Sequence, residues 1–341
     1  MMIHYLRSLN PPVLKISLTG ASGHVGANLI SELIASGHEL KVLTYRDERA
    51  LQGFKLEKIK GDLLDAASVD ELVRGSEIVI HLAAHISITG DPDGRVFRIN
   101  TEGTRHVCQA CVQHKVRRLI HFSSIHAFNA RPFEGVLDEN RARVGEKAFR
   151  YDYSKACGED IVRTFVKEGL DAVILNPTSV IGPKDFKPSL MGQVFVKLHD
   201  LTLPALVKGG YDFVDVRDVA HAAVLAIEKG RTGENYLISG TWKTIRELAD
   251  LVSQITGTKP PAFTSPKWLA LIGLPFIQLA AAISGKHALY TLESLNVLAN
   301  AHRNISNEKA RRELGFQPRP LEETISDIYA WFSEHNYLKR K

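Results

Sequence analysis

The sequence predicts an α/β fold, with a doubly wound parallel sheet and a smaller, mostly C-terminal lobe. Two observations predict this fold class. Short apolar segments of strand character alternate with helical patterns through the first half of the chain, and such alternation is typical of a parallel sheet with helices on both faces. A glycine-rich turn also follows the first of these segments directly. With 341 residues, the chain is long enough for one large domain or two.

The first strand–turn–helix unit consists of LKISLT (14–19), GASGHVG and NLISELIASG. LKISLT is a short apolar run of strand character. In the third segment, apolar residues recur at helical spacing and a glycine is a natural stop: Leu29, Ile30, Leu33, Ile34 and Gly37.

The turn of this unit, TGASGHVG, predicts a dinucleotide site of the Rossmann type. In a doubly wound sheet the ligand lies at the carboxyl ends of the strands, where the first turn meets the pyrophosphate. Gly20, Gly23 and Gly26 allow a tight turn in which backbone N–H groups approach the phosphates. The N-terminus of the following helix adds favourable partial charge. A merely structural turn is the alternative.

The later strands are predicted at 40–45, 56–59, 77–84, 117–124 and 171–177, and helical patterns at 102–114 and 155–169 lie between them. We expect residues 12–175 to form an NADP-binding Rossmann domain, to which 213–240 return. Residues 176–212 and 241–341 are expected to form the substrate-binding lobe.

The residue that reads the adenosine ribose is expected after the second strand. An acid there favours NAD, whereas an arginine accommodates the additional phosphate of NADP. Here Thr44 and Tyr45 are followed by Arg46, and no acid precedes Asp47. The sequence therefore favours NADP, with NAD as the alternative if Arg46 is only a solvated charge.

Composition and charge exclude several other classes of protein. The 43 Lys and Arg residues are scattered among 38 acids, so we expect no nucleic-acid partner. Cys108, Cys111 and Cys157 fit a reducing, cytoplasmic compartment. No second Cys pair accompanies Cys108 and Cys111, which indicates helix packing rather than zinc. The N-terminus has no apolar core typical of a signal peptide.

Four histidines fall near predicted strand ends: His81, His85, His121 and His126. No Cys or acidic ligand is arranged around His81 and His85, so we expect no metal site. A role for His85 or His126 in a substrate pocket is a second interpretation.

One uncharged apolar stretch, WLALIGLPFIQLAAAISG (268–285), is at the lower limit of membrane-spanning length. Pro275 would kink a helix there. We expect a buried helix pair beside the active site, with membrane contact as a less favoured alternative. Its larger side chains are candidates for a pocket wall: Trp268, Leu269, Leu271, Ile272, Phe276 and Ile277.

The ordered motifs resemble the extended short-chain dehydrogenase/reductase family over nearly the whole chain. The spacing G-x-x-G-x-x-G is followed by GDLLD, HLAA, NTEGT, FSSIHAF, YDYSK and LNPTSVIGP. Later landmarks are FVDVRDVAHAAVLAI (213–227), GENYLISG (233–240) and NEKARRELGF (307–316). The resemblance implies an NAD(P)-dependent enzyme, in which a homodimer would be common. It implies these cofactor-binding residues: Gly20, Gly23, His24, Val25, Gly26, Arg46, Asp62, Leu63, Ala83, Asn100, Tyr151, Lys155 and Pro177.

The same resemblance implies that Ser124, Tyr151 and Lys155 are catalytic. A ketone that accepts hydride develops negative charge on oxygen, so the site needs a proton donor. Lys155 lies four residues after Tyr151, on the same helix face, where it can lower the phenol pKa. Tyr153 has Cys157 at that spacing, which brings no charge, and is the weaker candidate. Ser123 is expected to be a backbone neighbour.

Three departures argue against a nucleotide-sugar epimerase or dehydratase. Tyr211 stands where those enzymes often carry a diphosphate-binding arginine, and Ser179 replaces an asparagine. FSSIHAF has neither the threonine nor the Asp-Glu pair of a dehydratase. The sequence is closer in character to dihydroflavonol 4-reductases and 3β-hydroxysteroid dehydrogenases.

We therefore expect an NADP(H)-dependent oxidoreductase that interconverts a ketone and a secondary alcohol on a fairly hydrophobic small molecule. A nucleotide-sugar epimerase or dehydratase is the first alternative. A dinucleotide-binding sensor or scaffold without catalysis is the second, and the intact Ser124, Tyr151 and Lys155 count against it.

Overall fold

The computed structural model describes residues 12–203, 205–283 and 290–339, with only the backbone described beyond Pro275 in helix α9. A seven-stranded sheet has the strand order β10-β6-β5-β4-β1-β2-β3, and all its pairings are parallel. Its strands are β1 (Lys15–Thr19), β2 (Glu39–Thr44), β3 (Glu57–Lys60), β4 (Ile78–His81), β5 (Arg118–Phe122), β6 (Ala172–Pro177) and β10 (Asn235–Ile238). The strand order reverses between β1 and β4, which is where doubly wound sheets bind ligands.

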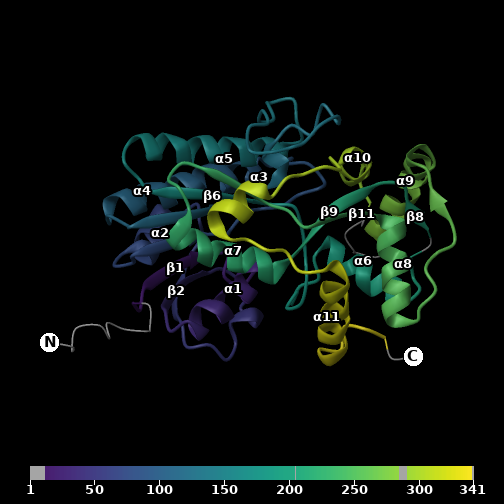
Figure 1. The fold of residues 1–341 in the computed structure, drawn as a ribbon, viewed down its shortest axis with the longest axis horizontal. Coiled ribbons are helices and arrows are strands. Elements are labelled where there is room, and N and C mark those ends of the chain that lie inside the picture. The colour runs from purple at the N-terminus through teal and green to yellow at the C-terminus, as the bar shows by residue number, and fades with distance from the viewer. Residues whose placement is uncertain (1–11, 204, 284–289, 340–341) are drawn as a thin grey trace.

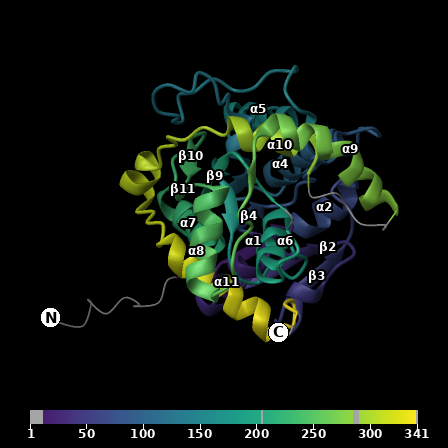
Figure 2. The same ribbon diagram turned by 90° about the vertical axis from the view of Figure 1, so that its right-hand side faces the viewer.

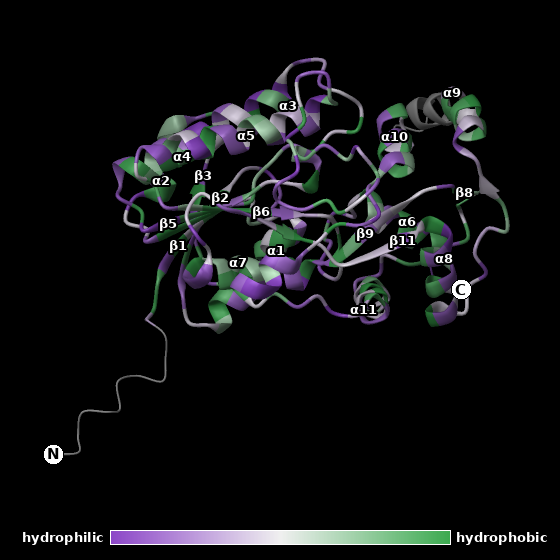
Figure 3. Cartoon of the chain, turned by 45° about the horizontal axis from the view of Figure 1, so that its top comes forward, coloured by the Kyte–Doolittle hydropathy of each residue, from purple (hydrophilic) through white to green (hydrophobic). Residues whose placement is uncertain are grey.

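Helices cover both faces of this sheet (Figure 1). One face carries α1 (His24–Ala35) and α7 (Val216–Lys229), and the other carries α2 (Ala66–Val73), α4 (Thr104–Gln113) and α5 (Arg150–Lys167). A short helix α3 (Arg95–Arg98) and a π-helical turn (Ile99–Gly103) lead into α4. Helices bury the strands on both faces, and the strand residues are accordingly largely hydrophobic (Figure 3). The predicted fold class is therefore confirmed.

The predicted strands agree with the structure to within a residue or two, except at the carboxyl end of β4, where the prediction is three residues too long. The sequence predicts strands over 77–84 and 117–124, whereas β4 ends at His81 and β5 at Phe122. Leu82 still donates its N–H to the Thr19 carbonyl at 3.2 Å, whereas the Ala83 N–H donates to the Thr19 side-chain Oγ1 at 3.2 Å. The residues that follow β4 and β5 line a cavity.

A smaller lobe lies beyond the carboxyl ends of the strands (Figure 2). It contains the sheet β11-β9-β7, formed by β7 (Ser179–Ile181), β9 (Gly210–Asp215) and β11 (Thr241–Thr244), and the pair β8 (Leu206–Val207) and β12 (Thr264–Ser265). Its helices are α6 (Leu190–His199), α8 (Ile245–Thr256), α9 (Lys267–Ile283), α10 (Leu292–Asn300) and α11 (Leu321–Glu334). Leu248, Phe195 and Ile325 are fully buried in its core.

Two segments of the chain cross between the large sheet and the smaller lobe. The chain returns to the large sheet through α7 and β10, whereas β9, just before α7, pairs inside the smaller lobe. A π-helical turn (Ala310–Leu314) lies late in the chain. Ala310 and Leu314 nevertheless pack in the core formed by the sheet, α1 and α7.

Helix α9 has 17 residues and contains Pro275. No helix within the described residues is both long and apolar enough to cross a membrane.

Candidate active site

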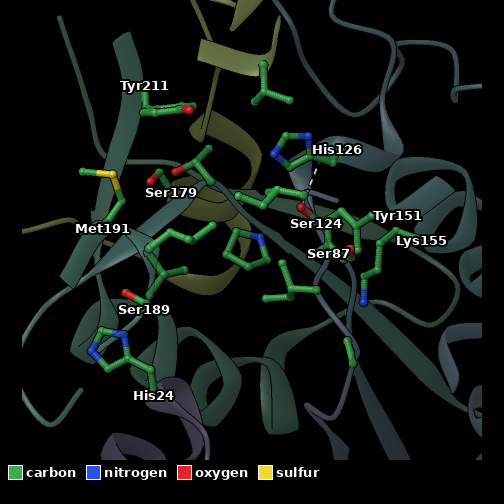
Figure 4. Close-up of a pocket in the computed structure, with 18 of the residues that line it drawn as sticks. His24, Ser87, Ser124, His126, Tyr151, Lys155, Ser179, Ser189, Met191 and Tyr211 are labelled. Carbon is green, nitrogen blue, oxygen red and sulfur yellow. Dashed lines mark hydrogen bonds between the residues drawn. The ribbon is translucent and has the colours of Figure 1, made fainter. Parts of the chain in front are cut away.

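A cavity of about 630 Å³ lies between the carboxyl ends of the large sheet and the smaller lobe (Figure 4). Its floor is formed by the turn after β1, the ends of β4, β5 and β6, and the start of α5. Its opposite wall comes from α6, β9 and α10 of the lobe. The cavity therefore joins the predicted dinucleotide turn to the predicted substrate lobe.

Ser124, Tyr151 and Lys155 all line this cavity. Ser124 directly follows β5 in extended conformation, and its Oγ accepts a hydrogen bond from the His126 N–H at 3.2 Å. Tyr151 and Lys155 lie one turn apart at the start of α5. The Lys155 ammonium donates to the Phe122 carbonyl at 2.7 Å, which fixes it beside the end of β5. In Figure 4 the three labelled side chains lie together at one side of the cavity.

Tyr153, the second tyrosine of YDYSK, points elsewhere. Its ring stacks on Phe97 with a centroid distance of 5.7 Å, and it is not among the residues that line the cavity. Tyr151 and Lys155 share a face of α5, as the i and i+4 spacing predicts.

Burial controls the ionisation of both groups. It raises the pKa of Tyr151 to about 12, although a hydrogen bond with Ser124 opposes this shift. It also lowers the pKa of Lys155 to about 8, with the Glu159 carboxylate opposing. The sequence argument expects Lys155 to lower the phenol pKa, but in the protein alone burial and the Asp152 carboxylate raise it.

The turn after β1 fits a dinucleotide phosphate. A Cβ on Gly26 would lie 2.5 Å from the carbonyl oxygens of Gly20 and Ala21, and one on Gly20, at φ 72°, would lie 2.6 Å from the Ala83 nitrogen. Only glycine fits either position. Gly23, the N-cap residue of α1, brings no capping side chain, so N–H groups of the first turn remain available to an anion.

The other predicted cofactor residues divide into two groups. His24, Val25, Ala83 and Pro177 line the cavity. His24 also has its Nε2 3.0 Å from the Pro183 carbonyl oxygen, which ties α1 to the segment entering the lobe.

Four predicted cofactor residues lie outside the cavity lining: Arg46, Asp62, Leu63 and Asn100. Arg46 is exposed after β2, and Asp62 pairs with Arg95 at 3.3 Å. Leu63 is buried beneath α4. Asn100 accepts a hydrogen bond from the His85 N–H at 2.8 Å and donates one to Ser154 Oγ at 2.8 Å, so it fastens the loop after β4 to α5.

The apolar wall of the cavity is not the one that the sequence suggests. Trp268 and Ile272 are exposed, and Leu269 is partly so, whereas Leu271 packs in the lobe core. The side chains of Phe276 and Ile277 lie outside the described residues. The wall comes instead from α6, α10, β9 and the loop after β4: Ile86, Ile88, Leu190, Met191, Val194, Tyr211, Val297 and Leu298. The sequence does carry a signal for this wall in α6, where apolar residues recur at helical spacing.

Three charged residues also face the cavity: His126, Asp152 and Glu293. Of these, only His126 is a candidate from sequence, since it follows the serine motif. His85 does not line the cavity, and His81 and His121 form a buried ring pair with centroids 5.3 Å apart. Within the described residues, no group of three His, Cys, Asp or Glu side chains is placed to hold a metal ion.

The fold and this cavity define an NAD(P)-dependent enzyme that carries out oxidoreductase-type chemistry. The chain belongs to the NAD dependent epimerase/dehydratase family, whose model matches residues 16–239, and thus to the extended short-chain dehydrogenase/reductases. It is 33% identical to sterol demethylase protein B of Methylococcus capsulatus, over 94% of this chain and 99% of that protein. It is 29% identical to a putative dihydroflavonol 4-reductase of Synechocystis, over 94% and 95% of the two chains.

Solved structures agree with the fold. The crystal structure of gox2253 superposes with a TM-score of 0.81 at 32% identity, covering 95% of this chain and 99% of that one. A dTDP-glucose 4,6-dehydratase from Streptomyces venezuelae, solved with NAD bound, superposes with a TM-score of 0.76 at 20% identity, covering 96% and 99%. At that identity the second likeness concerns the fold alone.

Proposed function

We propose that this protein is an NADP(H)-dependent reductase that interconverts a ketone and a secondary alcohol on a fairly hydrophobic small molecule. The observation that carries the proposal is the position of Ser124, Tyr151 and Lys155. They lie at the junction of a glycine-rich turn and an apolar cavity wall. Relatives named as a dihydroflavonol 4-reductase and a ketoreductase support the same reaction type.

In this reaction the bound nicotinamide dinucleotide supplies or accepts the hydride. The Ser124 hydroxyl donates a hydrogen bond to the substrate carbonyl and orients it. Tyr151 holds its proton at neutral pH, because burial raises the pKa of its phenol to about 12. It gives that proton to the oxygen as negative charge develops there, since an alkoxide is the stronger base. Lys155 holds the cofactor ribose and offers a positive charge to the phenolate that remains.

The charges of the cavity disfavour a nucleotide sugar as substrate. Among the described residues that line the cavity, Lys155 is the only lysine or arginine, and it lies on the cofactor side. A diphosphate in the lobe would meet no lysine or arginine among the described residues that line it, and it would meet the carboxylates of Asp152 and Glu293. An uncharged, largely apolar substrate needs no basic partner in the lobe and is not repelled by these carboxylates.

Substituting Tyr151→Phe tests the chemistry. A general acid contributes about 10²- to 10⁴-fold to the rate, so we expect turnover to fall by that factor. The dissociation constant for NADPH should change by less than about twofold, because the hydroxyl is used mainly in proton transfer. Activity is measured on flavonoid, steroid, aryl-ketone and sugar-nucleotide substrates, with NADPH and NADH in parallel. Tyr153→Phe is the matched control and should behave as the wild type. Wild-type turnover by the Tyr151 variant would refute the assignment.

Cofactor preference is tested at Arg46. The nearest acid, Asp47, is already engaged by Arg49, whose guanidinium holds the Asp47 pKa at about 2. The Arg46 guanidinium lies on the surface, 4.8 Å from the Tyr45 ring centre. We expect Arg46→Asp to raise KM for NADPH at least about tenfold and to lower KM for NADH, because an acid binds the ribose hydroxyls but repels a phosphate. Unchanged KM values would favour NAD as the natural cofactor.

A further inference from the structure

Three charged side chains from distant parts of the sequence meet at one wall of the cavity. His126 follows β5, Asp152 lies in the first turn of α5, and Glu293 lies in the first turn of α10. His126 Nδ1 is 3.2 Å from Asp152 Oδ1, and both side chains are close enough to influence the ionisation of the Glu293 carboxyl. The mechanism above uses none of these three side chains.

Glu293 has an unusual environment for a residue in the first turn of a helix. Such carboxylates stabilise helix N-termini while remaining in solvent, but Glu293 is only 8% exposed. The Thr291 hydroxyl donates to the Ile88 carbonyl at 2.6 Å, which docks the start of α10 on the loop after β4. That contact directs Glu293 into the cavity.

Within the described residues, no side chain donates a hydrogen bond to Glu293, and only the Gly90 N–H partners it. Burial and the nearby Asp152 carboxylate raise the Glu293 pKa to about 7. A buried carboxyl with unfilled acceptor sites is costly for the fold. A ligand that donates a hydrogen bond would remove that cost.

The charges of the cluster select the kind of ligand group. Burial lowers the His126 pKa, but Asp152 and Glu293 outweigh it and the net shift is upward, so His126 is already matched to Asp152. Among the described residues that line the cavity, the only lysine or arginine is Lys155, on the cofactor side, so Glu293 is left as an acceptor. Such a site accepts a hydroxyl and repels a carboxylate or phosphate.

The cluster also lies close to the reacting atoms. The His126 ring centre is 6.0 Å from that of Tyr151, and Asp152 is the next residue in the chain. A group bound there would share the cavity wall with Tyr151.

We propose that Glu293, with Asp152 and His126, forms a subsite for a substrate hydroxyl near the reacting carbonyl. The substrate class is then a hydroxyketone, or the corresponding diol, on an otherwise apolar skeleton. This proposal rests on the proposed function and adds the group that the lobe recognises.

The experiment compares 1-tetralone, 2-hydroxy-1-tetralone, 4-hydroxy-1-tetralone and 1-tetralone-4-carboxylate. In the wild type we expect at least one hydroxylated probe to exceed 1-tetralone about tenfold in kcat/KM, because a hydrogen bond to a charged group contributes this much. The carboxylate should react more slowly than 1-tetralone. Glu293→Leu should bring hydroxylated and plain probes within about twofold of each other. Glu293→Gln, which keeps an acceptor, should retain part of the hydroxyl preference and admit the carboxylate. The control is Glu322→Gln, at an exposed position on α11. This variant should retain the wild-type ratios of kcat/KM among the probes.

Binding is measured separately from turnover. Dissociation constants of the same probes for the NADPH-loaded Tyr151→Phe protein should follow the same order. Turnover with equal kcat/KM for all probes, or an unchanged preference in Glu293→Leu, overturns the subsite while the proposed reaction stands. Preferential binding of the hydroxylated probes without wild-type turnover of any ketone overturns the reaction but supports the subsite. The absence of both turnover and binding overturns both the subsite and the proposed reaction.

Discussion

Tyr151, Lys155 and Glu293 show how the fold sets ionisation at single residues. Burial disfavours the charged form of each, so the pKa rises to about 12 for Tyr151 and about 7 for Glu293, and falls to about 8 for Lys155. At neutral pH the phenol therefore carries a proton, as the proposed ketone reduction requires. The same burial makes Glu293 sensitive to pH near neutrality.

This sensitivity predicts how stability depends on pH. In the unfolded chain Glu293 loses its proton near pH 4.5, whereas the folded protein holds it up to about pH 7. The folded state binds more protons between these values, so Glu293 lowers the free energy of unfolding as pH rises through this interval. The loss is at most about 3 kcal/mol. We expect Glu293→Gln to lose correspondingly less stability than the wild type between pH 5 and pH 8.

The measurement is chemical denaturation of both proteins at several pH values in that interval. Glu322→Gln is again the control, because the Glu322 carboxyl on α11 is exposed to solvent. Parallel pH profiles for the wild type and Glu293→Gln would contradict the buried position of this carboxyl.

The sequence could identify Ser124, Tyr151 and Lys155 as candidates because each belongs to a local motif. The glycines after β1 can be identified from sequence in the same way, because their roles depend on a single turn. Glu293 has no such motif. Its position depends on α10 docking on a loop from the other end of the chain, and no local pattern encodes that contact.

At the scale of elements, a buried polar network joins α5 and β6 beneath Ser124. The Asn176 amide donates to the Ser124 carbonyl at 2.9 Å and to Glu159 Oε1 at 2.6 Å. The fully buried Glu159 carboxylate also pairs with Arg143 at 2.7 Å and Arg163 at 2.9 Å. The network therefore holds the end of β5 in place from behind the cavity.

Removing the carboxylate should affect both stability and catalysis. We expect Glu159→Ala to lower the free energy of unfolding by about 3–5 kcal/mol, because it leaves buried donors without an acceptor. It should also lower kcat more than it raises KM, since Asn176 would no longer be fixed against Ser124. Denaturant unfolding and steady-state kinetics measure the two effects.

Asp160→Ala provides a matched control on the same helix. Asp160 pairs with the same Arg163, at 3.3 Å, but its side chain is 73% exposed. An exposed pair contributes less than about 1 kcal/mol. Equal losses in the two variants would show that Glu159 has no special structural role.

Elements differ in how well sequence predicts them. Strand cores and amphipathic helices follow from short-range periodicity, so β1 to β6 appear almost where expected. The uncharged apolar stretch at 268–285 offers candidates for the pocket wall, yet Trp268 is 63% exposed and α6 contributes to the wall instead. Hydrophobicity alone does not tell which neighbour a helix packs against.

At the scale of the whole molecule, the smaller lobe is held to the dinucleotide-binding part by ion pairs as well as by the chain crossings. Asp218 on α7 is buried, and it accepts hydrogen bonds from the Arg319 main-chain N–H at 2.8 Å and from its Nε at 2.9 Å. Arg319 lies just before α11, which packs in the lobe core. This contact therefore sets where α11 begins relative to α7, and with it one side of the lobe that closes the cavity.

Substituting Asp218→Ala should loosen that junction first. The change leaves the Arg319 main-chain N–H without its acceptor and removes the buried carboxylate from a partly buried guanidinium, so we expect a loss of about 2–4 kcal/mol in the free energy of unfolding. Amide exchange should accelerate in α11 more than in β1 or α1, because the large sheet keeps its own core. Glu323→Ala is the control, since Glu323 binds the same Arg319 at 3.1 Å but is 51% exposed and should cost less than about 1 kcal/mol. If exchange instead rose equally in β1 and α11, the two parts would unfold as one unit and Asp218 would not be a local junction between them.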